Sequence, residues 1–515
     1  MFVAAYTPFG AEGIVIRVEA DIRRGIPGID VTGLAEGAVR EARERVRAAF
    51  RNSGYLFPPD RILINLAPAG VRKDGASLDL PIAISVMAAA GLVPNIDNVM
   101  VLGELELSGK LRPVRGVLAA TAAGIRAGIQ DFVVPAENAA EAAILATGHF
   151  TAARTLSEAV EALHVRAETG SLPPCEIAPA ETNESAILAD FSEVRDQGKY
   201  KRALEIAAAG AHNLLVFGPP GAGKTMLARR LPGIMAPLLP WEAVEVTSLH
   251  SLSGQLGHIS LITEAPFRTP HHSASAEGIL GGGKNVRPGE ISLAHFGTLF
   301  LDEAPEFRSN VLQSLREPLE DGVITISRAE GPVKLPADFQ IVLAANTCPC
   351  GRLGMRHGDG EPVFNCFCSP EEIHRYWRKF GAALLDRVEL RVGVNTPDIA
   401  AIGQTGEETS AAVAARVLKA VERQRERFTG TKIRRNARMP PALLDRFCIL
   451  NREAESVLHT NSARLGLSGR AFHGIVRVAR TIADLEGTEN ILPAHIEEAI
   501  VLRRQGDDPY DILNE

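Results

Sequence analysis

The first third of the chain alternates short β-branched apolar segments with a helical pattern. Residues 15–18 and 61–66 are rich in valine, isoleucine and leucine, as in strands. Between them apolar residues recur at the spacing of one helix face, and this pattern stops near Gly54. The residues on that face are Val39, Ala42, Val46, Ala49 and Phe50. The mixture predicts an α/β domain over residues 1–167.

A second alternation of strands and helices follows a stretch in which apolar residues show no regular spacing. Residues 168–189 are rich in proline, serine, threonine and glutamate and predict an interdomain linker. Residues 190–395 alternate apolar strands with helical stretches, which is typical of a parallel sheet with crossover helices. The expected strands are Asn213–Phe217, Thr298–Leu301 and Gln340–Ala345. Residues 396–515 are mostly helical by pattern, including 411–428 and 470–485, and predict a helical C-terminal domain.

Composition narrows the class of protein. Of the 515 residues, 46% are apolar and 23% are charged, as in globular proteins, and the formal net charge is −7. A chain of this charge does not coat nucleic acid in bulk, so any such contact needs a local basic surface. The longest weakly polar run, residues 80–94, is too short to span a bilayer, and the N-terminus lacks the pattern of a secretory signal. We therefore expect a cytoplasmic protein without a membrane partner.

A phosphate-binding loop follows the first strand of the second domain. Residues 218–225 match the pattern G-x-x-x-x-G-K-[ST] between a strand and a helix. Glycine lets successive backbone N–H groups approach phosphate oxygens at a helix N-terminus. We expect Lys224 to reach the β- and γ-phosphates of ATP and Thr225 to ligate Mg²⁺. The loop consists of Gly218, Pro219, Pro220, Gly221, Ala222, Gly223, Lys224 and Thr225.

Two carboxylates, Asp302 and Glu303, end the apolar strand at residues 298–301. Asp302 would hold the Mg²⁺ shell, and Glu303 would orient or deprotonate the attacking water. By itself an apolar run that ends in two acids usually marks a strand entering a solvated turn. The phosphate-binding loop upstream favours the catalytic interpretation.

These motifs and the stretch between them resemble the magnesium-chelatase-like AAA+ ATPases of the YifB/ComM family. The specific strings are RTPHHS at residues 268–273, GGG at 281–283 and PGEISLAH at 288–295, and the resemblance covers essentially the whole chain. It implies an AAA+ P-loop NTPase core, a helical lid and a homo-oligomeric ring of six subunits. For ComM-type members it implies a DNA helicase that drives branch migration during recombination of incoming DNA. Within this string we interpret His271 and His272 as loop residues near the ring channel.

The same resemblance suggests roles for three further residues. Asn346, which follows the strand at residues 340–345, resembles the sensor-1 asparagine that helps to position the water. Arg387 resembles the arginine finger offered to the neighbouring subunit's γ-phosphate, and Arg470 resembles the sensor-2 arginine of the lid. A planar, permanently charged guanidinium suits a phosphoryl group that gains charge in the transition state. The alternative for each arginine is a surface ion pair.

The motif Arg-Lys-Asp-Gly-Ala-Ser at residues 72–77 resembles the serine motif of Lon-type proteases, so the first domain resembles a Lon-protease-like α/β fold. Those enzymes use a lysine to activate the serine hydroxyl. The position that aligns with this lysine is Leu118, which cannot accept a proton, and neither Lys73 nor Lys110 fits the family's placement. We therefore expect a Lon-like domain without the catalytic lysine, used for assembly or for guiding DNA.

Four of the six cysteines form a CxC–x15–CxC pattern: Cys348, Cys350, Cys366 and Cys368. Four thiolates could hold a structural Zn²⁺ ion that closes an otherwise long loop. Reduced free thiols and a redox role are the alternatives, because CxxC spacing is the more usual zinc pattern. Cys175 and Cys448 stand alone, and we expect no role for them.

If DNA is the partner, branched or single-stranded, its phosphates must meet lysine or arginine. Candidates are Lys284 and Arg287 in the glycine-rich loop, and Arg328 and Lys334 in a predicted hairpin. Residues 416–438 hold nine basic against two acidic residues, a local charge of +7, which fits either a DNA surface or a solvated helix face.

The leading functional hypothesis is an ATP-driven ring motor that acts on DNA. The first alternative is a metal-insertion motor of the magnesium-chelatase type, against which the Lon-like domain argues, because by family pattern the chelatase ATPase subunit lacks it. The second alternative is a protein-remodelling ATPase built on an inactive protease fold.

Overall fold

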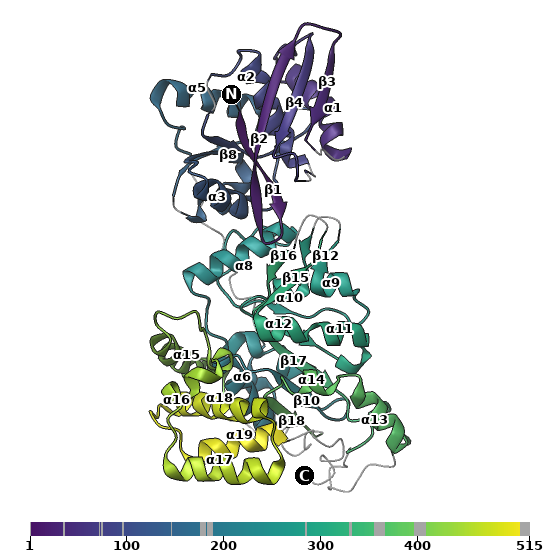
Figure 1. Ribbon diagram of the computed structural model, residues 1–515, viewed down its shortest axis with the longest axis vertical. Coiled ribbons are helices and arrows are strands. Elements are labelled where there is room, and N and C mark those ends of the chain that lie inside the picture. Colours follow the sequence, from purple (N-terminus) through teal and green to yellow (C-terminus); the bar gives the residue numbers. More distant parts are fainter. Residues whose placement is uncertain are drawn as a thin grey trace.

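The computed structural model shows an N-terminal domain at one end of the long axis and, at the other, a second sheet domain with the C-terminal helices beside it (Figure 1). The described residues are 2–33, 37–71, 73, 76–94, 97–145, 147–175, 182, 189–283, 286–328, 332–354, 366–395 and 408–504. A seven-stranded sheet domain lies at one end, a five-stranded sheet domain follows, and the C-terminal helices pack beside the second sheet. Among the described residues, no helix is both long and apolar enough to cross a membrane.

The N-terminal sheet has the strand order β3-β4-β2-β1-β5-β8-β9 and is covered on both faces. Alternate residues of its first strand enter two different apolar clusters, because successive side chains of a strand point to opposite faces. Helices α1, α2 and α5 cover one face and α3 covers the other. The strands are β1 (Val3–Phe9), β2 (Glu12–Arg23), β3 (Gly28–Thr32), β4 (Arg61–Ala67), β5 (Val99–Val101), β8 (Asp131–Pro135) and β9 (His149–Ala153). The helices are α1 (Gly37–Asn52), α2 (Asp79–Ala89), α3 (Val117–Arg126) and α5 (Leu156–Thr169). The two strands and the helix expected here are confirmed as β2, β4 and α1.

The second sheet is parallel throughout, so all of its strands end at the same edge. Its order is β11-β14-β17-β10-β18. The strands are β10 (Leu214–Phe217), β11 (Phe267–Arg268), β14 (Thr298–Leu301), β17 (Gln340–Ala345) and β18 (Leu390–Gly393). The three strands expected from the sequence are confirmed, with β10 beginning one residue later than expected. The loops that follow β10, β14 and β17 therefore meet at one edge.

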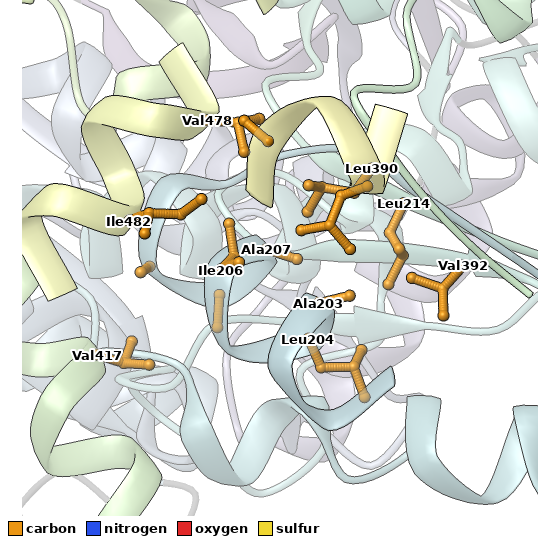
Figure 2. Packing of buried hydrophobic residues seen from close by; sticks show 14 of the residues in the cluster. Ala203, Leu204, Ile206, Ala207, Leu214, Leu390, Val392, Val417, Val478 and Ile482 are labelled. Carbon is orange, nitrogen blue, oxygen red and sulfur yellow. The ribbon is translucent and has the colours of Figure 1, made fainter. Parts of the chain in front are cut away.

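The C-terminal helices share a hydrophobic core with this sheet. Figure 2 shows side chains from α6 (Gly198–Gly210), from β10 and β18 and from two C-terminal helices converging on one cluster. Leu390, Val417 and Ile482 in this cluster are completely buried. The C-terminal helices are α15 (Ser410–Arg427), α16 (Leu444–Phe447), α17 (Arg452–Leu465), α18 (Gly469–Glu486) and α19 (Pro493–Arg504). The sheet and the helical lid thus form one packed unit.

The N-terminal domain docks on α8 (Pro240–Ser253) of the second domain through buried polar groups. The hydroxyl of Ser251 accepts a hydrogen bond from the Gly116 N–H at 2.8 Å and donates one to Glu141 Oε1 at 2.5 Å. Burial raises the pKa of Glu141, although its hydrogen bonds oppose the rise. Leu252 packs into the apolar cluster of the N-terminal domain. Polar and apolar contacts therefore both join the two domains.

Two antiparallel hairpins stand where the domains meet (Figure 1). They are β12–β13 (Gly281–Gly282 and Arg287–Pro288) and β15–β16 (Val323–Ile326 and Val333–Pro336). The second is the hairpin expected from the sequence. Ile326, Val333 and Leu335 share an apolar cluster with Phe9, which ends β1, so the N-terminal domain covers one side of this hairpin.

The basic run at residues 416–438 is neither a DNA surface nor a solvated helix face. Of its nine basic residues, all of them described, Lys419 and Lys432 are the two exposed ones. Arg427 pairs with buried Asp484, and other arginines pair with acidic groups far away in the sequence. These pairs are Arg416 with Glu205, Arg434 with Glu242 and Arg438 with Asp338. The run joins the lid to the sheet.

We expect Asp484→Ala to lower the free energy of unfolding by about 3–5 kcal/mol, because it leaves buried arginines without their carboxylate. Asp484 is completely buried and pairs with both Arg427 and Arg480. Chemical denaturation of the purified chain measures the change. Lys432→Ala, exposed in the same basic run, is the control and should unfold as the wild type does. Equal stability of Asp484→Ala and the wild type would contradict the structural role of these pairs.

Candidate nucleotide site and its partner edge

The phosphate-binding loop lies at the carboxyl edge of the second sheet, between β10 and α7 (Lys224–Ala228). Gly223 immediately precedes this helix with φ of +83°, a left-handed conformation that favours glycine. Lys224 Nζ donates hydrogen bonds to the carbonyl oxygens of Gly218 and Pro219, both at 2.8 Å. The loop therefore curves around the ammonium group, at the position where such loops bind phosphate.

The residues expected around Mg²⁺ and the attacking water converge on this loop. Thr225 Oγ1 donates a hydrogen bond to Asp302 Oδ2 at 2.8 Å, so the two expected Mg²⁺ ligands touch. Asn346 Oδ1 accepts a hydrogen bond from Lys224 Nζ at 3.1 Å. Asp302 Oδ1 also accepts from the Glu303 N–H at 3.0 Å. One edge of the sheet thus collects Lys224, Thr225, both acids and the asparagine.

Lys224 is nearly inaccessible, with 8% of its surface exposed. This burial lowers its pKa to about 8, although Asp302 and Glu303 act in the opposite direction. A bound phosphate chain would place negative charge beside the buried ammonium group and so favour its protonated form.

Glu303 turns its side chain toward solvent, where 60% of it is exposed, and its φ of +48° lies in the left-handed region. His272 Nδ1 lies 4.0 Å from Glu303 Oε2, and the rings of His271 and His272 are tilted against each other with centroids 4.1 Å apart. Their expected position near a ring channel stays a prediction, and the structure places His272 beside the expected catalytic base. Their only signal in the sequence was their place in the RTPHHS string.

Arg387 and Arg470 lie together at the opposite edge of the sheet. Arg387 precedes β18, and its carbonyl oxygen accepts a hydrogen bond from Asn213 Nδ2 at 2.8 Å, just before β10 begins. At about 3.3 Å per residue, β10 separates this point from Gly218 by roughly 15 Å. Neither arginine can therefore reach the phosphate-binding loop of its own chain.

Glu320 joins the two arginines. It accepts hydrogen bonds from Arg387 Nη2 and, at 2.9 Å, from Arg470 Nη2. Burial raises the pKa of Glu320, but the hydrogen bond from Arg387 and the charges of both arginines outweigh burial and lower it. These groups line a cleft of about 540 Å³ between sheet and lid, together with Arg477. Nothing in the sequence around Glu320 distinguishes it from other surface acids.

The four clustered cysteines come together as the spacing predicts. Cys348 Sγ lies 3.4 Å from Cys350 Sγ and 3.5 Å from Cys366 Sγ, and all four sulfur atoms lie within 4.8 Å of one another. All six cysteines are free, so no disulfide competes for these thiols. The residues could therefore hold one metal ion, while the identity of that ion stays a prediction.

The candidate DNA contacts lie on the two hairpins. Arg287 of β13 and Lys334 of β16 are exposed, and Arg328 is half-buried. Lys284 falls outside the described residues. The structure brings these basic residues to the region between the two domains, away from the P-loop.

Two residues considered for the base of a Lon-like serine motif are buried in the structure. Leu118, at the expected lysine position, is completely buried in α3, and its N–H donates to Glu141 Oε1 at 2.8 Å. Lys73 is also buried, and its ammonium group donates to the carbonyl oxygens of Gly33, at 2.8 Å, and Pro68. Both arrangements are those of structural residues.

A parallel sheet with a phosphate-binding loop at one edge, paired arginines at the other and a helical lid is the layout of an AAA+ P-loop NTPase, and comparisons with known families give the same class. Residues 190–402 match the family model for magnesium chelatase subunit ChlI, and residues 407–503 match the model for its C-terminal part. A further model, described as subunit ChlI of Mg-chelatase, matches residues 18–138. Because this match lies in the N-terminal domain, that domain no longer argues against a chelatase-type function.

The chain belongs to the YifB/ComM family of magnesium-chelatase-like AAA+ ATPases. It is 40% identical over 501 residues to the uncharacterized protein YifB of Salmonella typhimurium, covering 96% of this chain and 95% of that one. It is also 40% identical over 504 residues to competence protein ComM of Haemophilus influenzae, with the same coverage. A Lon protease of Geobacter metallireducens is 30% identical over 141 residues, which are 26% of this chain and 17% of the protease. The AAA+ class implies ATP and Mg²⁺ as cofactors and commonly an oligomeric ring.

We expect the affinity for Mg-nucleotide to fall as the pH rises through about 8. Lys224 must be protonated to face a phosphate, but burial holds its pKa at about 8 in the nucleotide-free chain. Above that pH, binding takes up a proton, so the dissociation constant rises up to about tenfold per pH unit. Titration with a fluorescent ADP analogue between about pH 7 and about pH 9.5 measures this. Any residual affinity of Lys224→Arg should be independent of pH, because a guanidinium stays charged. A flat profile for the wild type would refute the shifted pKa.

Proposed function

We propose that the protein is an ATP-hydrolysing ring motor that acts on DNA, a branch-migration helicase that supports recombination and natural transformation. The observation that carries the proposal is the position of Arg387 and Arg470, beyond the reach of their own nucleotide site. A guanidinium at that edge can stabilise transition-state charge on the nucleotide of a neighbouring copy. A head-to-tail contact of this kind closes into a ring, which we take to have six subunits. Near-full-length similarity to a protein named for competence supports DNA as the substrate.

Each residue of the nucleotide site has a role that its position supports. Lys224 binds the β- and γ-phosphates, while Thr225 and Asp302, already 2.8 Å apart, hold the Mg²⁺ shell. Glu303 activates the water, since its carboxylate is largely exposed beside the P-loop, with His272 4.0 Å away. Asn346 positions that water. Glu320 keeps Arg387 and Arg470 oriented until a neighbouring triphosphate draws them away.

The remaining assignments complete this proposal. DNA passes the two hairpins and meets Arg287, Arg328 and Lys334, together with Lys284. Residues 1–167 form the Lon-like domain without the catalytic lysine, 168–189 a linker, 190–395 the motor core with its four-cysteine insertion, and 396–515 the lid. The four cysteines hold one structural Zn²⁺ ion. The protein works in the cytoplasm.

A mixing experiment tests whether the arginines act on a neighbour. Lys224→Ala lacks a working nucleotide site but keeps its arginine, whereas Arg387→Ala keeps the site and lacks the arginine. Each alone should hydrolyse almost no ATP. Mixed in equal amounts, rings regain up to about a quarter of wild-type turnover, because that fraction of random interfaces joins an intact site to an intact arginine. Glu303→Gln also keeps its arginine, so mixing it with Arg387→Ala should give the same quarter, whereas a chain that carries both Lys224→Ala and Arg387→Ala is the control and should restore nothing. No recovery in the Lys224→Ala and Arg387→Ala mixture would contradict catalysis between neighbours.

The DNA assignment predicts that branched DNA stimulates ATP turnover, and that Arg287→Ala combined with Lys334→Ala removes most of the stimulation. The double variant should also lower the slope of log affinity against log salt concentration by about two, one for each lost phosphate contact. Lys419→Ala combined with Lys432→Ala removes two exposed lysines from the lid and serves as the matched control. ATP turnover that no DNA stimulates would contradict the proposal.

A chelatase-type metal-insertion motor is the second candidate, favoured by the three ChlI family matches. Turnover stimulated by a porphyrin-binding partner and indifferent to DNA would select it. Stimulation by unfolded polypeptide instead would select a protein-remodelling ATPase.

A further inference from the structure

The four-cysteine cluster is attached to the nucleotide site rather than standing apart from it. Cys348 is two residues beyond Asn346, which receives the hydrogen bond from the P-loop lysine. The turn that holds Cys350 passes close to the P-loop, because a Cβ added to Gly351 would lie 2.9 Å from Pro220 Cδ. The first pair of sulfur atoms is therefore carried by backbone that touches the P-loop on one side and Asn346 on the other.

The second pair of cysteines is carried by a different element. Helix α13 (Pro370–Arg378) begins directly after it. In this helix the Trp377 Nε1–H donates to the Thr347 carbonyl oxygen at 3.0 Å, and the indole packs edge-on against Phe217 with centroids 5.4 Å apart. Phe217 is the last residue of β10 before the P-loop. The cysteines thus bridge the helix that supports the P-loop and the turn that touches it.

The geometry of the sulfur atoms fits a closed tetrahedral metal site. With zinc–sulfur bonds of about 2.3 Å, the sulfur atoms of such a site lie about 3.8 Å apart. The separations among Cys348, Cys350 and Cys366 are 3.4, 3.5 and 3.6 Å, close to this value, and Cys368 Sγ lies within 4.8 Å of all three. Four thiolates leave no open coordination position, so the ion is structural and takes no part in chemistry.

We propose that zinc in this cluster controls nucleotide binding, by holding α13 and the Cys348–Gly351 turn together so that Pro220 and Asn346 keep their positions. The inference rests on the proposed ATPase activity and on the proposed zinc ion, and it adds that nucleotide binding depends on the zinc. Without the ion, four sulfur atoms that have no disulfide to join them are released, and the turn loses its metal link to α13, while the Trp377–Thr347 hydrogen bond stays. A small shift of this turn moves Pro220 of the phosphate-binding loop and Asn346, the partner of Lys224, and so weakens nucleotide binding.

The test uses the full chain. Purified protein should contain one zinc ion per chain by elemental analysis. Removal of the zinc with a chelator should raise the dissociation constant for Mg-ADP at least about tenfold, and added zinc should restore it. Cys366→Ser should reproduce the loss, and Cys175→Ser, a free cysteine in the linker segment 168–189, should retain both zinc and affinity. Zinc loss that leaves the dissociation constant unchanged, or iron in place of zinc, would overturn the inference.

A second variant tests the contact between Gly351 and Pro220 while the zinc ion stays bound, so that a loss of affinity is not explained by misfolding of a metal-free chain. Gly351→Ala keeps all four cysteines but pushes a methyl group against Pro220. We expect it to keep one zinc per chain and to bind Mg-ADP more weakly than the wild type. Wild-type affinity in this variant would overturn the coupling. None of these measurements includes DNA. ATP turnover that DNA does not stimulate would therefore contradict the proposed motor function without affecting this result.

Discussion

All strands of the motor sheet run in one direction, and this single polarity divides the chemistry of ATP between two edges. The carboxyl ends deliver Asp302, Glu303 and Asn346 to one place, because they follow their strands directly, and the loop after β10 brings Lys224 to the same place. The amino ends deliver Arg387 to another place. The strands keep the two edges of the sheet apart, so under the proposed assignment one chain holds two incomplete halves of a site. Assembly would then be part of the chemistry.

The sequence predicted those parts of the arrangement whose residues lie close together along the chain. The P-loop, the acidic strand end and Asn346 could be identified because each joins a short apolar strand to a chemical group within a few positions. The cysteines could be grouped for the same reason, since two CxC pairs separated by one loop have few ways to fold. Helix ends such as that of α1 near Gly54 also follow from local preferences.

The parts that the sequence could not predict depend on contacts between distant positions. Counting charges along residues 416–438 suggested a surface, but Glu205, Glu242, Asp338 and Asp484 turn most of those arginines inward. The hydrogen bonds that Glu320 accepts from both arginines cross 67 and 150 positions. His272 reaches Glu303 from a loop that only the folded sheet brings near. Charge patterns along a chain carry no information on which partner the fold will supply.

The common core of sheet and lid limits how this protein can move. Opening a hinge between them would expose Val417, Ile482 and their neighbours to water, at a cost of roughly 1.5–3 kcal/mol for each large side chain. The buried join at Ser251 and Glu141 ties the N-terminal domain to the same body. A protomer therefore behaves as a stiff lever with nucleotide contacts near its base. In the proposed ring, small rotations between neighbours around bound nucleotide would become larger displacements at the far end, where the N-terminal sheet lies.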